Sequence, residues 1–172
     1  IRRHNWSGHV EKGLYSGATK LCGLHLDDRN LIMNSLDLSV QLGTVKLPNP
    51  LVAASGCFGY GLEYADVVDL STLGGIAVKG LFLDERQGHP PQRIVETPSG
   101  MLNAIGLQGI GVHRFIDDQL PMLREHGVNI FVNICGTTID EYAELARILS
   151  DTEGVAALEL NISCPNIKEG GI

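Results

Sequence analysis

Short apolar runs alternate with amphipathic segments along the chain from residue 50 onward. Each run leads toward a polar side chain, and the runs are Pro50–Ala54, Gly74–Val78, Asn129–Val132 and Val155–Leu160. Their brevity and their lack of strict alternation are typical of strands that are covered on both faces of a parallel sheet. Because helical patterns lie between most of the runs, the order of elements predicts an α/β protein.

Two of the amphipathic segments predict helices. The first has apolar residues at three- and four-residue spacing, namely Val112, Phe115, Ile116, Leu120 and Leu123, with Gly127 as its end signal. The second opens with the capping-box pattern Thr138–Glu141 and continues with apolar residues at Ile139, Tyr142, Ala143, Ala146 and Leu149. His113 and His126 fall on a polar face or at a helix end, so we assign them no ligand role.

The segment before the first run has two parts. Leu36–Leu47 alternates apolar and polar residues around Gly43, which predicts a β-hairpin with one covered face. Residues 1–32 are rich in Arg, His, Gly and Lys and have no sustained period, whereas Met33 opens the patterned region. We expect residues 1–32 to be a non-native leader read from upstream of the true start, or else a disordered or weakly helical one, and residues 33–172 to form a domain.

Composition narrows the class of protein. The chain has 172 residues, of which 44% are hydrophobic, a formal net charge of -7 and a pI near 5.3. This size suits one ordinary domain, and the acidic balance is unlike that of a general nucleic-acid binder. No apolar run approaches the roughly 20 residues that span a bilayer, and no signal peptide is evident, so we expect a cytoplasmic protein without membrane attachment.

The cysteines indicate neither a disulfide framework nor a metal site. They are Cys22, Cys57, Cys135 and Cys164, far apart and without a C-x-x-C pair, so we interpret them as reduced thiols. Cys164 lies between Asn161 and Asn166, just past a predicted strand end, where α/β folds place their chemistry. A buried structural cysteine is the alternative, and the local sequence leaves both interpretations open.

A long segment, 81–111, separates the second run from the first helix. Long connections of this kind tend to be functional. Its glycines Gly106, Gly109 and Gly111 do not form a dinucleotide fingerprint after a strand, although glycine also allows a backbone to approach a flat ligand closely.

Four motifs, in this order and spacing, closely resemble the dihydroorotate dehydrogenase family. They are Ala54–Gly59, Val78–Gly80, Met101–Gln108 and Leu160–Asn166, and the resemblance extends from about Met33 to Ile172. It implies an FMN-containing (β/α)8 TIM barrel that oxidises dihydroorotate to orotate in pyrimidine synthesis. A complete barrel of this kind needs on the order of 250 residues, so the chain would hold the first half, about four β/α units after an N-terminal β-hairpin. The FMN phosphate site of the family would lie in the later half.

The resemblance also suggests a class within the family. Cys164 is similar to the cysteine of the soluble class, where the membrane-bound class has serine. The sequence of Asn103–Gln108 is most similar to that of the NAD-linked class 1B, whose partner subunit holds FAD and an iron-sulfur cluster. A homodimer of the catalytic subunit joined to that partner is therefore implied. Gly109–Gly111 departs from the Asn-Pro-Gly that is frequent in the family.

Site roles follow from the resemblance. Cofactor contacts are implied for Ala54, Ser55, Gly56, Lys79, Gly80, Asn133 and Asn161. Substrate contacts are implied for Lys79, Asn103, Ala104, Ile105, Gly106, Leu107, Asn161 and Asn166. Cys164 would be the base that takes a proton from carbon five of dihydroorotate while a hydride leaves carbon six.

Residue chemistry is compatible with these roles. Lys79 would stabilise negative charge at the pyrimidine end of the flavin, although a structural ion pair at the mouth of the barrel is the alternative. Neutral amides suit a ring with both N–H and C=O groups, because each amide offers a donor and an acceptor. Cys57 and Cys135 are expected to be packed thiols without a role.

Two other functions remain open at the level of sequence. One is a different FMN-dependent barrel oxidoreductase, similar to dihydropyrimidine dehydrogenase. The other is a non-catalytic half-barrel that binds a partner through its open strand edges.

Overall fold

A computed structural model describes residues 36–162 of the chain. The chain divides into two units, Ile1–Asp37 and Leu38–Ile172, and all the helices and strands given below lie in the second. Within the described range, no helix is both long and apolar enough to cross a membrane.

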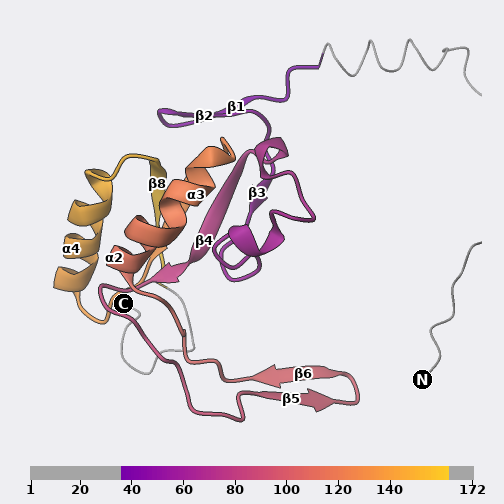
Figure 1. Cartoon of the computed structure of the whole chain (residues 1–172), viewed down its shortest axis with the longest axis vertical. Helices are drawn as coiled ribbons and strands as arrows, with labels where there is room; N and C mark the ends of the chain where they lie inside the picture. Colours follow the sequence, from indigo (N-terminus) through magenta and orange to yellow (C-terminus); the bar gives the residue numbers. More distant parts are fainter. Residues whose placement is uncertain (1–35, 163–172) are drawn as a thin grey trace, which may run out of the picture. The chain divides into compact units, whose positions relative to one another are not determined.

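Four parallel strands form the central sheet, in the order β3–β4–β7–β8 (Figure 1). They are β3 (Val52–Ala53), β4 (Gly75–Leu81), β7 (Ile130–Ile134) and β8 (Val155–Leu160). The parallel α/β sheet expected from the apolar runs is therefore confirmed. Two strands are longer than the runs: β4 continues through Lys79 and Gly80, and β7 includes Asn133.

Two helical segments cover one face of this sheet. The first consists of α2 (Val112–Arg114), the π-helical turn η3 (Phe115–Gln119) and α3 (Leu120–Glu125), and the second is α4 (Ile139–Ser150). Two buried residues of the first segment, Phe115 and Leu120, are five positions apart, which matches the wider π turn. The short 3-10 turns η1 (Leu62–Tyr64) and η2 (Leu70–Thr72) lie between β3 and β4.

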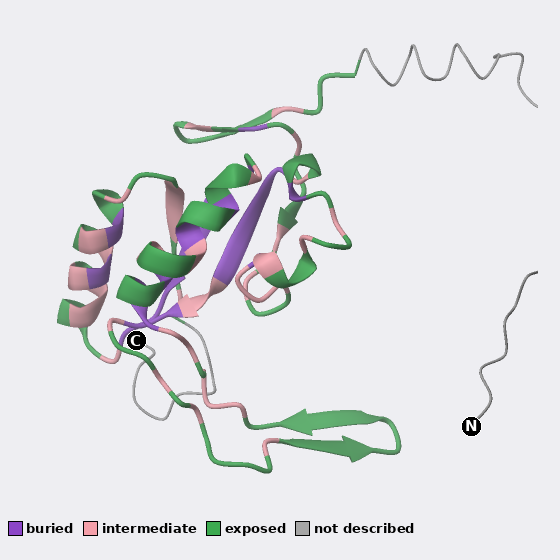
Figure 2. Ribbon diagram, viewed as in Figure 1, coloured by how far each residue is buried: buried purple, intermediate pink, exposed green. Residues whose placement is uncertain are grey.

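The main core lies between the helices and the sheet, where Figure 2 shows most of the buried surface. It comprises side chains from β4, β7 and the helices, among them Ile76, Val78, Ile130, Val132, Phe115, Leu123, Leu145 and Leu149. In α4 the predicted apolar stripe needs correction, because Ile139 is 72% exposed, whereas Leu145, absent from the prediction, is fully buried. Ile139 is the first helical residue, where a side chain extends past the edge of the core.

The opposite face of the sheet, called here the inner face, carries different residues. Alternate positions of β4 and β7 place Ala77 and Phe131 on it, where Leu47 of the first hairpin packs against them. That hairpin, β1 (Val40–Leu42) and β2 (Val45–Leu47), turns at Gly43 with a φ of 57°. The predicted hairpin is thus confirmed, and its Leu47 covers the amino end of the inner face. The expected covered face is found only on β2, because every residue of β1 is exposed.

Register shifts occur at two places in the sheet. Ile130 pairs with Val155 but Phe131 pairs with Ala157, so β8 has one extra residue, Ala156, at this point. Downstream of it, Glu159 is the partner of Asn133. A similar shift in β4 between Val78 and Leu81 allows Leu81 to join the core under the helices.

The segment 81–111 contains a second hairpin that the sequence pattern did not predict. Its strands are β5 (Ile94–Thr97) and β6 (Gly100–Asn103), and every residue in both is exposed. In Figure 1 the hairpin extends away from the sheet on the side to which β4 points, opposite to β1 and β2. It therefore lies at the carboxyl end of the parallel strands.

Candidate active site at the carboxyl ends of the strands

Polar side chains from three strand ends form one hydrogen-bonded cluster. The hydroxyl of Ser55, which follows β3, donates to Glu159 Oε1 at 2.5 Å. Asn133 Nδ2 also donates to Glu159 Oε1 and lies 3.3 Å from Ser55 Oγ. Asn161 Nδ2, just past β8, donates to Asn133 Oδ1 at 3.3 Å. Three residues with predicted roles, Ser55, Asn133 and Asn161, are thus brought together, and Glu159 joins them.

The parallel sheet brings these side chains together. Parallel strands bring their carboxyl ends to one edge, and the pairing of Asn133 with Glu159 aligns two polar residues across β7 and β8. Asn133 is only 3% exposed, so its amide needs the partners it has here.

Glu159 was missed from the sequence because it lies in an apolar run. A signal was present nevertheless: a single carboxylate in an otherwise apolar strand is costly to bury unless polar partners face it. Glu159 lies within β8 and not among the polar residues that follow a strand end.

Lys79 lies beside this cluster on β4, next to Gly80. It is half-buried, and its backbone N–H donates to Gly59 O at 2.8 Å, which ties the strand to the glycine-rich loop after β3. The ion pairs found within residues 36–162 are Arg114–Asp118, Arg124–Glu153 and Arg147–Glu144, and Lys79 belongs to none of them. A structural ion pair for Lys79 is therefore not found in this range.

Two glycines with predicted cofactor contacts differ in their surroundings. A Cβ on Gly80 would lie 2.6 Å from Cys135 Sγ and 2.9 Å from Asn133 Oδ1, so the protein itself requires glycine there. Gly56 has a φ of 82° and no atom within 4 Å of its Cβ position, and its neighbour Ala54 is also exposed. The loop after β3 thus leaves open space next to Ser55.

The predicted substrate residues lie on the segment 81–111 instead. Asn103 ends β6, and the residues after it, Ala104, Ile105, Gly106 and Leu107, return toward the sheet. Backbone bonds tie this stretch to the opposite side of the segment: Ala104 N donates to Arg93 O at 2.8 Å and His89 N to Ile105 O at 3.0 Å. Among residues 36–162, no hydrogen bond joins Asn103–Leu107 to the Ser55 cluster.

The end of this stretch is held close to the sheet. Arg86 and Gly109 exchange two backbone hydrogen bonds of 2.8 and 2.9 Å. Ile110 N donates to the hydroxyl of Tyr60, on the glycine-rich loop, at 3.3 Å. Burial raises the pKa of Tyr60, with a smaller contribution from the Glu63 carboxylate, so its hydroxyl stays protonated. Tyr60 thus connects the loop after β3 to the segment that carries the predicted substrate residues.

Helix α4 contacts the backbone at the end of β8, next to the site. The hydroxyl of Tyr142 donates to the backbone carbonyl of Asn161 at 2.5 Å. At the start of the helix, Thr138 Oγ1 accepts from Glu141 N at 3.2 Å, which is half of the predicted capping box. The Glu141 carboxylate accepts from Thr137 N–H and from the Thr137 hydroxyl, and these hydrogen bonds, with a smaller contribution from Thr138 N–H, lower the pKa of Glu141.

The remaining predicted residues have mixed outcomes. Cys164 and Asn166 lie outside the residues that the structure describes. Cys135 is buried as expected, with its sulfur 3.5 Å from Asn133 Oδ1. Cys57 is exposed, so the expectation that it is packed is wrong; it follows Gly56 in the open loop.

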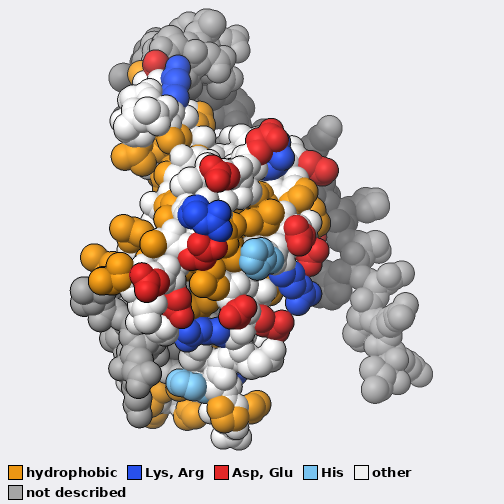
Figure 3. Space-filling view, turned by 90° about the vertical axis from the view of Figure 1, so that its left-hand side faces the viewer, with side chains coloured by type: hydrophobic (Ala, Val, Ile, Leu, Met, Phe, Trp, Pro, Cys, Tyr) orange, Lys and Arg blue, Asp and Glu red, His pale blue; other side chains and the backbone are white. Residues whose placement is uncertain are grey.

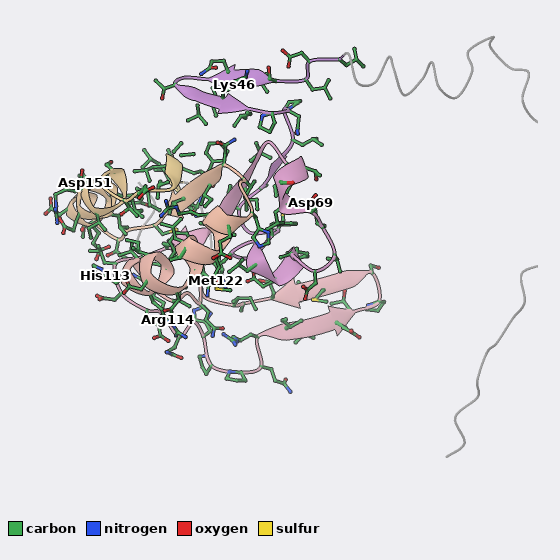
Figure 4. All side chains as sticks on the ribbon, turned by 45° about the horizontal axis from the view of Figure 1, so that its top comes forward. Lys46, Asp69, His113, Arg114, Met122 and Asp151 are labelled. Carbon is green, nitrogen blue, oxygen red and sulfur yellow. The ribbon has the colours of Figure 1, made fainter. Side chains whose placement is uncertain are left out.

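The remaining charged side chains and histidines form no second candidate site within residues 36–162. On the side of the molecule where α4 lies, acidic and basic side chains are intermixed (Figure 3). His113 and Arg114 lie on the outer side of α2, with exposed side chains (Figure 4). Residues 36–162 contain no group of three or more His, Cys, Asp or Glu residues that could hold a metal ion.

Comparison with known proteins gives the family. The family model described as dihydroorotate dehydrogenase matches residues 37–172. The chain belongs to the dihydroorotate dehydrogenase family. Its fold is also similar to that of DHODH from Eimeria tenella, crystallised in complex with ferulenol, with a TM-score of 0.55 at 19% sequence identity over 77% of this chain and 38% of that one.

Within the family, the chain is similar to curated proteins named dihydroorotate dehydrogenase B (NAD(+)), catalytic subunit. It is 56% identical to the protein from Thermodesulfovibrio yellowstonii over 75% of this chain and 43% of the relative. For the protein from Solidesulfovibrio magneticus the identity is 57%, over 80% of this chain and 45% of the relative. The chain thus spans less than half the length of these relatives.

Proposed function

We propose that the protein to which this chain belongs oxidises dihydroorotate to orotate in pyrimidine synthesis. The observation that carries the proposal is the convergence of Ser55, Asn133 and Asn161 at one edge of a parallel sheet, in a chain of the dihydroorotate dehydrogenase family. The carboxyl edge of the strands is where α/β barrels build their active sites.

The residues at this edge suit FMN. The isoalloxazine ring presents alternating N–H and C=O groups, and the chain offers a hydroxyl, two amides and the cation of Lys79, with open space at Gly56. Ala54, Ser55, Gly56, Lys79, Gly80, Asn133 and Asn161 would hold its ring. When bound, FMN supplies the chemistry of accepting a hydride from the substrate.

This chain's own residues would orient the substrate and move a proton. Asn103 to Leu107, Asn161 and Asn166 would bind the ring and carboxylate of dihydroorotate, with Lys79 adding positive charge. Cys164, which follows β8 in the sequence, would take the proton from carbon five as the hydride leaves carbon six. The bonding electrons of the C5–H bond then form the C5=C6 double bond of orotate.

The proposal also covers the fold, the electron acceptor and the assembly of the protein. The sheet β3–β4–β7–β8 with its helices would be the first half of a (β/α)8 barrel, within a domain that begins near Met33. The names of the relatives support transfer of electrons to NAD through a separate subunit, which would carry FAD and an iron-sulfur cluster. The catalytic subunit would be a homodimer.

The test replaces the proposed base in a full-length subunit. We define the full-length chimaera as residues 36–172 of this chain joined to the remaining carboxyl-terminal part of the Thermodesulfovibrio yellowstonii relative, loaded with FMN. Cys164→Ser should slow reduction of the flavin by dihydroorotate by about a hundredfold or more, the usual scale for loss of a general base. The measurement is single-turnover bleaching of flavin absorbance over a pH series.

The pH profile and a second cysteine provide the controls. A free thiol has a pKa of about 8.5, so the parent rate should rise with pH as the thiol ionises. Cys57→Ser changes an exposed thiol outside the cluster and should leave the rate unchanged. If Cys164→Ser bleaches at the parent rate with the parent pH profile, the base lies elsewhere.

A further inference from the structure

We propose that Glu159 is a positioning residue that fixes the hydrogen-bond direction of the Asn133–Asn161 pair. It thereby makes Asn161 present a carbonyl oxygen to a ring N–H of the ligand. This inference rests on the proposed function, because it concerns the same site. It assigns a role to a residue that none of the four sequence motifs includes.

The direction of the chain of hydrogen bonds starts at the carboxylate. An ionised carboxylate only accepts hydrogen bonds, so a neighbouring amide must turn its NH2 group toward it. Asn133 does so, and its Nδ2 donates to Glu159 Oε1. The carbonyl oxygen of Asn133 must then face the other way, where it accepts from Asn161 Nδ2 at 3.3 Å.

The Cys135 thiol is consistent with this orientation. A thiol is a weak donor, and Cys135 Sγ lies 3.5 Å from Asn133 Oδ1 rather than from its nitrogen. Ser55 contributes on the other side, because its hydroxyl donates to the same Glu159 oxygen at 2.5 Å. Glu159 therefore fixes both the amide of Asn133 and the hydroxyl proton of Ser55.

The consequence is transmitted to Asn161. Since Asn161 uses an N–H to bond Asn133, its Oδ1 becomes the atom suited to accept from a ligand. Among the described residues, nothing donates a hydrogen bond to that oxygen. A ring N–H next to a carbonyl, as in a flavin or a dihydropyrimidine, is the complementary group.

Exchanging the carboxylate and the amide between positions 159 and 133 tests whether Glu159 sets the direction of the hydrogen bonds. Glu159→Gln allows Asn133 to adopt either orientation, because a glutamine amide can both donate and accept. Asn133→Asp places two carboxylates in contact. The double variant Glu159→Gln/Asn133→Asp restores one carboxylate and one amide, and the carboxylate at position 133 still presents an acceptor to Asn161.

The experiment measures the dissociation constant of FMN by fluorescence titration of the FMN-free full-length chimaera, and thermal unfolding of the same FMN-free proteins. We expect the dissociation constant to rise about fivefold in Glu159→Gln and about fiftyfold in Asn133→Asp, because like charges in contact cost more than a lost direction. The double variant should return to within about fivefold of the parent, the signature of a coupled pair. Glu153→Gln, which removes an exposed carboxylate paired with Arg124, should match the parent.

Specific outcomes would overturn the inference. If Glu159→Gln binds FMN as the parent does, Glu159 does not position the site. If the effects of the single variants simply multiply in the double variant, Glu159 does not act through Asn133. If affinity falls only in proportion to thermal stability in every variant, the role is purely structural. Dihydroorotate turnover by the parent chimaera is measured separately, so that loss of the proposed function is not mistaken for failure of this inference.

Discussion

Gly80 shows how closely a single position near the site is constrained by its neighbours. Its Cβ position lies 2.6 Å from Cys135 Sγ and 2.9 Å from Asn133 Oδ1, and both of those residues are buried. The glycine therefore protects the geometry of Asn133, in addition to any contact with a cofactor.

Gly80→Ala should accordingly destabilise the full-length chimaera by about 1–3 kcal/mol, the usual cost of overpacking. Urea unfolding of the FMN-free protein measures this change. Gly80→Ala/Cys135→Ala removes the sulfur contact and should recover part of the loss. Gly100→Ala is the matched control, because its Cβ position has no atom within 4 Å. Equal stability of Gly80→Ala and Gly100→Ala would show that the site is looser than described.

Individual residues of the cluster differed in how far they could be predicted from the sequence. Ser55, Asn133 and Asn161 were found because polar residues at the ends of apolar runs must meet at one sheet edge. The exposure of Cys57 was not found, because this residue lies in the loop after β3, where no periodic pattern indicates burial. Glu159 was not found, because its role depends on which face its strand position takes. Face and register depend on pairing between strands, which a single run of sequence does not contain.

At the scale of elements, a hydrogen bond from the Tyr142 side chain links α4 to the residue that follows β8. The hydroxyl of Tyr142 donates to Asn161 O, and its ring packs next to Gly136, where a Cβ would lie 2.9 Å from Tyr142 Cδ2. Asn161 N in turn donates to Ile134 O at 3.0 Å. The backbone from which the predicted Cys164 loop departs is thus held by both a strand and a helix.

Tyr142→Phe removes only the hydroxyl of this connection. We expect a loss of about 1 kcal/mol in unfolding free energy, the typical net value of one hydrogen bond. Thermal unfolding of the full-length chimaera measures it. Tyr64→Phe deletes a hydroxyl from a partly exposed ring that stacks on Phe58, and it should have a smaller effect. A larger loss in Tyr64→Phe than in Tyr142→Phe would contradict the connection.

The helices and the parallel strands were predictable because each buries one consistent set of apolar residues. The β5–β6 hairpin was not, since all of its side chains are exposed, including Ile94 at 52% and Leu102 at 67%. Without a covered face, a strand has no alternating pattern to recognise. The π turn within the first helical segment could not be predicted either, because the spacing of its apolar residues also fits an ordinary amphipathic helix.

At the scale of the whole described unit, the sheet has two open edges. β3 and β8 each pair on one side only within residues 36–162, and Val52 and Leu160 are 40% and 59% exposed. Open edges with apolar side chains are templates for pairing with another chain.

Residues 36–172 produced alone should therefore self-associate, whereas the full-length chimaera should give a discrete species. Light scattering after size-exclusion chromatography distinguishes the two. Adding charge at the edges with Val52→Lys and Leu160→Lys should reduce the association of the isolated segment. A monodisperse monomer from the unmodified segment would show that the edges are protected.

The extra residue Ala156 has a consequence for how this strand can vary. Its effect resembles that of a one-nucleotide insertion on a reading frame, because every later position of β8 changes face. If the same residues formed a regularly alternating strand without the bulge, Leu158 and Leu160 would take the face that Glu159 and Asn161 now occupy. Deletion of Ala156 would leave Val155 opposite Ile130 and Ala157 opposite Phe131, as they are now, so the polar cluster should survive it. Deletion of Leu158, by contrast, should move Glu159 to the other face of the sheet and break the cluster.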